Sequence, residues 1–472
     1  MEAYNLVAYK FFIFVQETMN SPAYVIPKER RSTGQEIHRI VVVGGGAGGL
    51  ELVTQLGDSL GKSRKAQIIL VDKSATHIWK PLLHEVAAGS MDPSAHQLEY
   101  VAQARWHNFE FYQGAMMDVS RDEKCLRVAP VLDENQNPIL PERVIPYDTL
   151  VLAIGSVTNF FNVPGAEKHA MAVDTVTQAE TIRRRILSAC MRSQSGAFQS
   201  VDAPVKKVHL VIIGGGATGV ELAAELRNTA EVLAAYGLHK LDPQKDVQIT
   251  LVEAGPRILP PLPEKISIET TRLLGYLNID VMTGDRVTQV TPDAVLTASG
   301  KSLPSDLTVW AGGIRVPAML RDMGLETNGI GQIIVSNTLQ SVSDKNIFAF
   351  GDCAACSWGD SGKIVPPRAQ AAHQQASTLV KSMHRLLAKK PLPVFTYRDY
   401  GSLISLGNYE AVGNLMGRMV GRSVKIQGFL ARMLYLSLYR NHQMALHGFF
   451  RMAVDAFVDW LRHNTKPRVK LH

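Results

Sequence analysis

The sequence predicts an α/β protein in which one structural plan is used twice. Residues 40–52 read IVVVGGGAGGLEL, and residues 210–222 read LVIIGGGATGVEL. In each copy a run of apolar, mostly β-branched residues meets a G-x-G-x-x-G turn and continues as a helix. A strand, a glycine turn and a helix in this order are typical of the first unit of a Rossmann-like parallel sheet. The repeat therefore predicts two Rossmann-like domains in one chain.

The two glycine turns are the candidate dinucleotide-binding sites. In this motif the first glycine allows the tight turn, the second lets the backbone approach a pyrophosphate, and the third lets the helix pack on the strand. The phosphates would lie at the helix N-terminus, where unpaired N–H groups and the helix dipole favour negative charge. The candidate residues are Gly44, Gly46, Ala47 and Gly49 in the first turn, and Gly214, Gly216 and Gly219 in the second.

Each turn is followed by a second strand that ends in an acidic residue. Residues 66–72 end in Asp72, and residues 247–253 end in Glu253. A carboxylate at this point accepts hydrogen bonds from the ribose hydroxyls of a dinucleotide. Two glycine-rich turns in an ordinary α/β sheet are the alternative, but the same four features at both places favour nucleotide binding. Two such sites indicate electron transfer between two cofactors, usually FAD and NAD(P)H.

Composition limits the class of protein. The chain has 472 residues, enough for two or three domains, with 46% hydrophobic and 20% charged residues. Four cysteines in this length argue against a disulfide framework. No apolar run approaches the roughly 18 residues of a membrane-spanning helix. The net charge of +7 is by itself compatible with nucleic acid, anionic lipid or simple solubility.

The order of the expected elements divides the chain. A buried strand at residues 147–156, which contains Gly155, should return to the first sheet, and the strand that ends at Gly313 mirrors it in the second. Residues 109–113 and 125–128 read as strands of a meander. The predicted parts are a disordered extension at residues 1–35, a first nucleotide domain at 36–158 and 322–394, a second nucleotide domain at 159–321, and a C-terminal segment at 395–472.

Several polar residues are expected near the first nucleotide. The loop after Asp72 carries His77, Lys80 and His84, which could reach a cofactor, although each also fits an exposed loop. A strand at residues 346–352 ends in Asp352. Because ligands bind at the carboxyl edge of a parallel sheet, this carboxylate is a candidate for contacting a sugar hydroxyl.

Two helices carry paired polar residues. The helix after Pro366 and Pro367 has Gln370 and Gln374 four residues apart, hence on one face. The second glycine-turn helix has Glu221 and, one turn later, a second glutamate. The glutamines could equally be exposed helix residues.

The composition changes after residue 428. Residues 429–440 and 449–461 read as helices that mix aromatic, aliphatic and basic side chains. Such helices suit a membrane interface, and nearby cations are drawn to anionic lipid. A dimer interface or a helix packed on the core is the alternative.

Together these motifs resemble the type II NADH:quinone oxidoreductases, the single-subunit alternative NADH dehydrogenases of respiratory membranes. The resemblance runs from residue 36 to the end, and its most specific part is AQAAHQ at residues 369–374, which matches the AQxAxQ quinone-site motif of that group. It implies a glutathione-reductase-like pair of domains with a C-terminal α+β segment that associates with the membrane. It further implies non-covalent FAD, NADH and a membrane quinone, without proton pumping.

The same resemblance implies a homodimer, peripheral on the cytoplasmic face of the inner membrane, with no nucleic-acid partner. It implies that the first turn, Asp72 and Asp352 bind FAD. It implies that the second turn and Glu253 bind NADH, since Glu253 disfavours a 2′-phosphate, although Arg257 lies nearby in sequence. Glu221 would face the nicotinamide. The expected catalytic residues are Glu221, Gln370, Gln374 and Lys80, with Gln370 and Gln374 bracketing the quinone, and Lys80, Gly155 and Gly313 join the cofactor-binding residues.

Three alternatives stay open. A disulfide reductase on this scaffold needs a redox cysteine pair near the flavin, whereas Cys353 and Cys356 directly follow Asp352 and are interpreted as small buried residues. A sulfide:quinone oxidoreductase relies on cysteines at positions where this chain has none. A non-catalytic flavoprotein that binds NADH as a redox sensor would carry the same two turns.

Overall fold

The computed structural model contains two parallel sheets of five strands each. The first has the order β24-β12-β2-β3-β6, and the second has the order β14-β21-β15-β16-β17. Both predicted Rossmann-like units are therefore present. The structure describes residues 23–30, 34, 36–199, 206–236, 238, 240–359, 361–406, 411–415, 424–427, 440, 442–446, 452–454 and 457–458.

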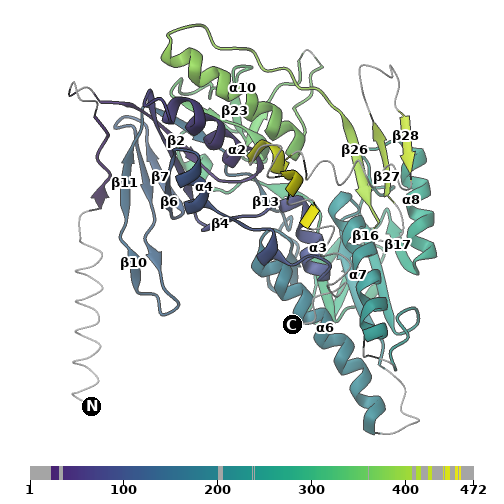
Figure 1. Cartoon of the computed structure of the whole chain (residues 1–472). Coiled ribbons are helices and arrows are strands. Elements are labelled where there is room, and N and C mark those ends of the chain that lie inside the picture. The colour runs from purple at the N-terminus through teal and green to yellow at the C-terminus, as the bar shows by residue number, and fades with distance from the viewer. Residues whose placement is uncertain are drawn as a thin grey trace, which may run out of the picture.

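The first sheet is assembled from distant parts of the chain (Figure 1). Its central strand β2 leads through the first glycine turn into helix α2, and helix α10 packs on α2. Strand β6 extends this parallel sheet beyond β3, so the prediction that residues 109–113 belong to a meander was wrong. The elements are β2 His38–Val43, α2 Ala47–Leu56, β3 Ala66–Asp72, β6 Glu110–Gln113, β12 Thr149–Leu152, β24 Ile347–Ala349 and α10 Ala369–Leu387.

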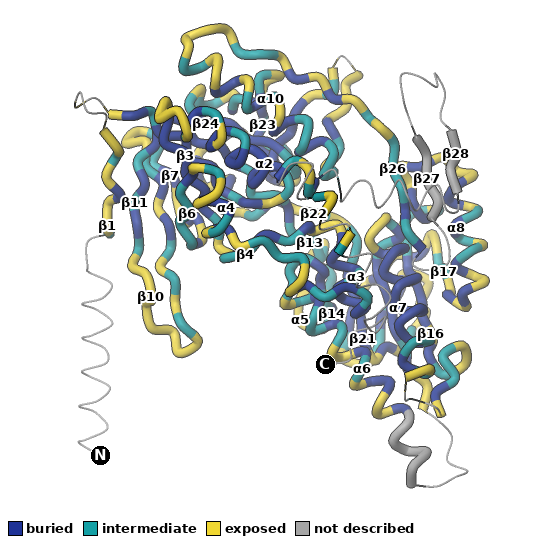
Figure 2. Tube along the Cα trace, in the orientation of Figure 1, coloured by how far each residue is buried: buried dark blue, intermediate teal, exposed yellow. Residues whose placement is uncertain are grey.

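The second sheet repeats the arrangement, with β15 leading into helix α7. The short helix α3, which lies early in the chain, packs against α6 and α7 of this second unit. Figure 2 shows α7 largely buried, and the inner strands of both sheets are buried too, whereas the edge strands β6 and β17 are more exposed. The elements are α3 Leu83–Ala88, β14 Ala170–Ala172, α6 Val176–Gln199, β15 Val208–Ile213, α7 Ala217–Tyr236, β16 Val247–Glu253, α8 Glu264–Tyr276, β17 Ile279–Thr283 and β21 Leu307–Trp310.

Smaller sheets and turns complete the described chain. One of them is the antiparallel sheet β26-β27-β28. The remaining strands are β1 Tyr24–Val25, β4 Thr76–His77, β5 Leu98–Glu99, β7 Met116–Ser120, β8 Cys125–Val128, β9 Val131–Leu132, β10 Pro138–Leu140, β11 Arg143–Pro146, β13 Val157–Thr158, β18 Val287–Val290, β19 Ala294–Thr297, β20 Ser302–Pro304, β22 Ile314–Arg315, β23 Ile333–Val335, β25 Ala354–Cys356, β26 Gly401–Ser405, β27 Ala411–Leu415 and β28 Val424–Gln427. The remaining helical pieces are η1 Gly57–Gly61, η2 Lys80–Leu82, η3 Pro93–Ala95, α4 Tyr100–Trp106, α5 Ala166–His169, α9 Met319–Asp322 and η4 Gly351–Cys353.

Residues 23–30 correct the prediction of an extension that is disordered throughout. Strand β1 pairs in parallel with β11, and the fully buried guanidinium of Arg39 holds the chain that follows it. Arg39 donates through Nη1 to the carbonyl of Ile26 at 3.1 Å, through Nη2 to the carbonyl of Pro27, and through Nε to Gln67 at 2.7 Å. The sequence missed this segment because its strand has only two residues, both exposed.

The C-terminal helices are only partly described. Residues 442–446 are helical, whereas most of the stretches predicted as helices at 429–440 and 449–461 lie outside the described residues. Within the part of the chain that the structure describes, no helix is both long and apolar enough to cross a membrane.

Replacing Arg39 with methionine should lower the free energy of unfolding by about 2–4 kcal/mol, because buried carbonyl groups lose their donor. Urea denaturation measures this loss, and protease cleavage within residues 23–30 should become faster. Arg30→Met is the matched control, since Arg30 is exposed and its contact with Glu36 is a long 3.8 Å. Equal stability of Arg39→Met and wild type would show that Arg39 does not anchor the segment.

Candidate functional site

The first glycine turn is closed on one side and open on the other. Gly44 has a positive φ of 100°, and a Cβ there would overlap the carbonyl of Ala153. A Cβ on Gly49 would overlap the carbonyl oxygen of Gly44, so α2 meets the turn through glycine alone. In contrast, nothing lies within 4 Å of a Cβ built on Gly46. The backbone at Gly46, next to Ala47 at the start of α2, is therefore free to meet a ligand.

The second turn has the same geometry. Gly214 has a positive φ of 112°, and a Cβ there would collide with Gly312. A Cβ on Gly219 would overlap the carbonyl oxygen of Gly214, while the space around Gly216 is open to 4 Å. The two predicted sites thus agree in backbone conformation as well as in sequence.

Each predicted acid lies against its own turn. Asp72 accepts a hydrogen bond from the N–H of Gly45 at 2.7 Å, and burial raises the pKa of Asp72 even though backbone N–H groups oppose the shift. Glu253 accepts from the N–H of Gly215 and from the N–H of Gly255, both at 2.6 Å. Both carboxylates therefore lie against the second residue of their glycine turns, and their contact with a ribose stays a prediction.

The peptide of Gly45 is held from its carbonyl side as well. His77 donates through Nδ1 to this carbonyl at 2.8 Å, and the hydroxyl of Tyr100 donates to it at 2.7 Å. The other ring nitrogen of His77 lies 3.0 Å from Nε2 of His442, whose ring also stacks on Trp79 with 4.2 Å between centroids. The short C-terminal helical piece thus reaches the first turn.

Two glycines with positive φ follow the strands β12 and β21, each three residues after the strand ends. Gly155 has φ 69° and Gly313 has φ 74°. The chain continues from them into β13 and β22, which pair antiparallel with each other. The segments after the two mirrored strands therefore pair with each other and form a two-stranded connection between the sheets.

Lys80 and Asp352 meet at Ser156. Lys80 donates through Nζ to the carbonyl of Ser156 at 3.0 Å and to Asp174 at 2.9 Å, while the Ser156 hydroxyl donates to Asp352 at 2.7 Å. Burial would raise the pKa of Asp174, but the charge of Lys80 and a hydrogen bond from Thr158 leave it below its ordinary value. Asp352 and Lys80, predicted separately, thus belong to one network.

Glu221 is buried where three elements meet. Its Oε1 accepts the N–H of Ser405 at 3.0 Å, and its Oε2 lies 3.8 Å from Nδ1 of His84 on α3. Nδ1 of His84 donates to the carbonyl of Pro81 at 2.9 Å, and complete burial lowers the pKa of His84 to about 4. The burial of His84 excludes the alternative that it is an exposed loop residue.

The side-chain amides of Gln370 and Gln374 on α10 form hydrogen bonds with backbone groups of residues 398–401. Gln374 donates to the carbonyl of Arg398 at 2.8 Å and accepts its N–H at 3.0 Å. Gln370 donates to the carbonyl of Gly401 at 3.0 Å and accepts the N–H of Tyr400 at 3.2 Å. Contact of these amides with a quinone stays a prediction.

The cysteines are structural. Cys353 and Cys356 are fully buried free thiols, and burial raises the pKa of each to about 11. The Cys353 thiol donates to the carbonyl of Leu152 at 3.4 Å. These contacts agree with the interpretation of small buried residues. Among the described residues, no group of three or more His, Cys, Asp or Glu side chains could hold a metal ion.

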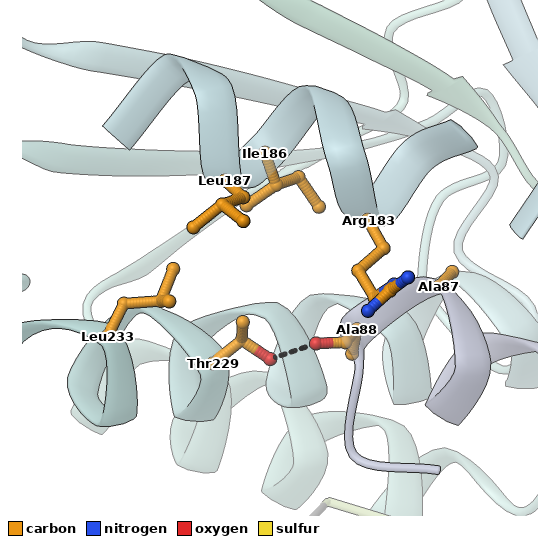
Figure 3. Close-up of a pocket in the computed structure, with 7 residues that line it drawn as sticks. All are labelled: Ala87, Ala88, Arg183, Ile186, Leu187, Thr229 and Leu233. Carbon is orange, nitrogen blue, oxygen red and sulfur yellow. Dashed lines mark hydrogen bonds between the residues drawn. The ribbon is translucent and has the colours of Figure 1, made fainter. Parts of the chain in front are cut away.

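A small apolar cavity lies where α3 packs against α6 and α7 of the second domain (Figure 3). The hydroxyl of Thr229 donates to the carbonyl of Ala88 at 2.6 Å across its floor. The space has room for about one water molecule, so it is a packing gap rather than a nucleotide site. Its lining residues are Ala87, Ala88, Arg183, Ile186, Leu187, Thr229 and Leu233.

Sequence reasoning missed four residues that contact the predicted ones. Tyr100, Ser156 and Asp174 act through their side chains but belong to no motif, and Ser405 contributes its backbone N–H. The position of Ser156 directly after Gly155 was the one signal that could have indicated it.

Comparison with known proteins places the chain. Residues 38–376 match the family described as pyridine nucleotide-disulphide oxidoreductase. The type II NADH:quinone oxidoreductase of Haemophilus influenzae is 42% identical over 443 residues, covering 92% of this chain and 99% of that protein. The structure of NDH2 from Plasmodium falciparum in complex with NADH superposes with a TM-score of 0.76 at 20% identity, covering 92% of this chain and 99% of that one. The sulfide:quinone oxidoreductase of Aquifex aeolicus shares the fold, with a TM-score of 0.65 at 17% identity and coverage of 87% and 92%. The chain belongs to the pyridine nucleotide-disulphide oxidoreductase family and, within it, to the type II NADH:quinone oxidoreductases.

Proposed function

We propose that this protein transfers electrons from NADH through non-covalently bound FAD to a membrane quinone, without pumping protons. The observation that carries the proposal is the pair of glycine turns with equal geometry, each with its own acid, in a chain of this family. When bound, the flavin would accept a hydride from NADH and pass two electrons to the quinone.

The first turn would hold FAD. Open space at Gly46 and the start of α2 suit a pyrophosphate, and Asp72 would accept ribose hydroxyls. Asp352, oriented by Ser156, would contact the ribityl or pyrophosphate region. Gly155 lies directly before this network. Lys80 and the N-terminus of α10 would offer positive charge to the reduced flavin.

The second turn would hold NADH, with Gly216 at the pyrophosphate and Gly313 in the connection that follows the sheet. Glu253 would accept ribose hydroxyls and repel a 2′-phosphate. Arg257, which could have favoured NADPH, donates to the carbonyls of Leu259 at 3.2 Å and Pro260 at 2.7 Å. This engagement supports NADH as the donor.

Three side chains would act near the reacting centre. Glu221, buried beside His84, would face the nicotinamide. Gln370 and Gln374, one turn apart on α10, would form the quinone side of the site. No proton path through the bilayer is needed for this chemistry, since electrons and protons would reach the quinone from one side.

We place the protein at a membrane surface as a peripheral homodimer. The mixed aromatic and basic composition of residues 429–472 suits contact with anionic lipid. The proposed side is the cytoplasmic face of the inner membrane.

Sulfide:quinone oxidoreduction is the runner-up because the Aquifex enzyme shares the fold. The buried, weakly acidic thiols of Cys353 and Cys356 do not suit a sulfide-oxidising pair, since the thiolate is the reactive form.

Absorbance spectroscopy of the purified protein tests the function directly. We expect a flavin spectrum that bleaches on adding NADH and returns on adding a soluble quinone, over many turnovers. A folded sample that takes up no flavin would rule the proposal out. Turnover with sulfide instead of NADH would favour the runner-up, and binding of NADH without turnover would favour a sensor.

Alanine at the third glycine of each turn should separate the two cofactors. Because the new Cβ overlaps backbone, Gly49→Ala should yield protein without flavin, whereas Gly219→Ala should keep flavin and raise the KM for NADH by about tenfold or more. Gly275→Ala is the control, since a Cβ there meets nothing within 4 Å. Loss of flavin from Gly219→Ala, with retention in Gly49→Ala, would reverse the assignment.

Deleting residues 429–472 should release the protein from vesicles that contain anionic lipid. Deletion of residues 463–472 alone removes tail cations and should weaken binding mainly at low salt, because raised salt already screens their attraction to anionic lipid. Vesicle sedimentation measures both. Full retention of the longer deletion on vesicles would place the anchor elsewhere.

A further inference from the structure

Residues 398–405, here called the strap, are bonded at their start to two candidate site residues. Gln374 forms a two-way pair with the peptide groups of Arg398, at 2.8 and 3.0 Å. Gln370 bonds the carbonyl of Gly401 at 3.0 Å and the N–H of Tyr400 at 3.2 Å. Each amide uses both its donor and its acceptor on the strap, as a neighbouring strand would.

An ion pair also holds the start of the strap. Asp399 accepts the N–H of Gly401 at 2.8 Å and faces the guanidinium of Arg368 at 3.4 Å. Arg368 is the N-cap residue of α10, so the strap is tied to the first turns of this helix.

The strap ends on the other domain. The N–H of Ser405 donates to Glu221 of α7 at 3.0 Å. Ile404 lies buried in the core of the second domain, whereas Tyr397, just before the strap, lies buried in the core of the first. Figure 1 shows the chain passing from the α10 layer to β26 beside the second sheet. One short segment therefore joins the predicted quinone side to the predicted nicotinamide side.

We propose that Gln370 and Gln374 are positioning residues that act through the strap, and that the strap couples the quinone side of the site to Glu221. This inference rests on the proposed function and deepens it. Residues 398–401 would line the quinone site, and Gln370 and Gln374 would hold these residues in position. A displacement at either end would be transmitted along the strap, because both ends are hydrogen-bonded and the side chains of Tyr397 and Ile404 near these ends are buried. A change at either end should then be detectable at the other.

The test perturbs each end separately. Gln374→Leu and Gln370→Leu remove the amides at the start. Ser405→Pro removes the N–H at the end and also fixes φ there. Proline suits this position because β26 is an edge strand and this N–H faces Glu221. Ser405→Ala keeps the N–H and is the matched comparison, and Gln248→Leu, at an exposed glutamine of β16, is the control.

Two measurements report the outcome. Hydrogen exchange of the protein without substrates should show the amides of Arg398 and Tyr400 exchanging about fivefold faster in the leucine variants. Steady-state kinetics should show a several-fold rise in the KM for quinone in Ser405→Pro but not in Ser405→Ala. Reciprocally, Gln374→Leu should raise the KM for NADH, which also decides the question if Ser405→Pro does not fold.

Unchanged exchange at Arg398 and Tyr400 together with a raised KM for quinone would overturn the proposal in favour of direct quinone contact by the glutamines. If Ser405→Pro changes only the KM for NADH, and Gln374→Leu leaves the KM for NADH unchanged, the strap does not couple the quinone side to Glu221. Absence of NADH:quinone turnover in the wild type would instead refute the proposed function, while hydrogen exchange would still decide whether the glutamines hold the strap.

Discussion

The close approach of a helix to a strand end, at two glycine turns, is the constraint on which this protein depends. The third glycine of each turn, Gly49 or Gly219, touches the carbonyl oxygen of the first, and no larger residue fits there. This contact sets where α2 and α7 begin, and it leaves open space beside the second glycine of each turn. A helix N-terminus next to open space is a site for a phosphate group. Packing and ligand binding are therefore two consequences of one missing side chain.

Many of the candidate residues make their polar contacts at the connections between the two sheets. The pair β13 and β22 links the strand ends, and Lys80 bonds there to Ser156. Helix α3 leaves the first domain and packs on α6 and α7 of the second, bringing His84 to Glu221. The strap crosses in the same region. Buried polar groups at such a junction need partners from both sides, which restricts how the domains can sit.

Much of this arrangement could be predicted from the sequence. The turns, the acids at Asp72 and Glu253 and the strand that precedes Asp352 follow from local patterns, because each is encoded by about a dozen neighbouring residues. The strand ends earlier than predicted, at Ala349, and Asp352 lies in the short helix η4. The prediction failed where a segment has no local pattern. The two-residue strand β1 is one example, since it depends on the buried guanidinium of Arg39 for its place.

The sequence by itself determined two nucleotide folds, their order and the residues at their turns. Only the tertiary structure decided the partners of those residues. Ser156 meets Asp352 across 196 positions, and Ser405 meets Glu221 across 184. The physical reason is that helix and strand periodicity is written locally, whereas a backbone N–H or a carboxylate finds its partner only after the sheets have packed.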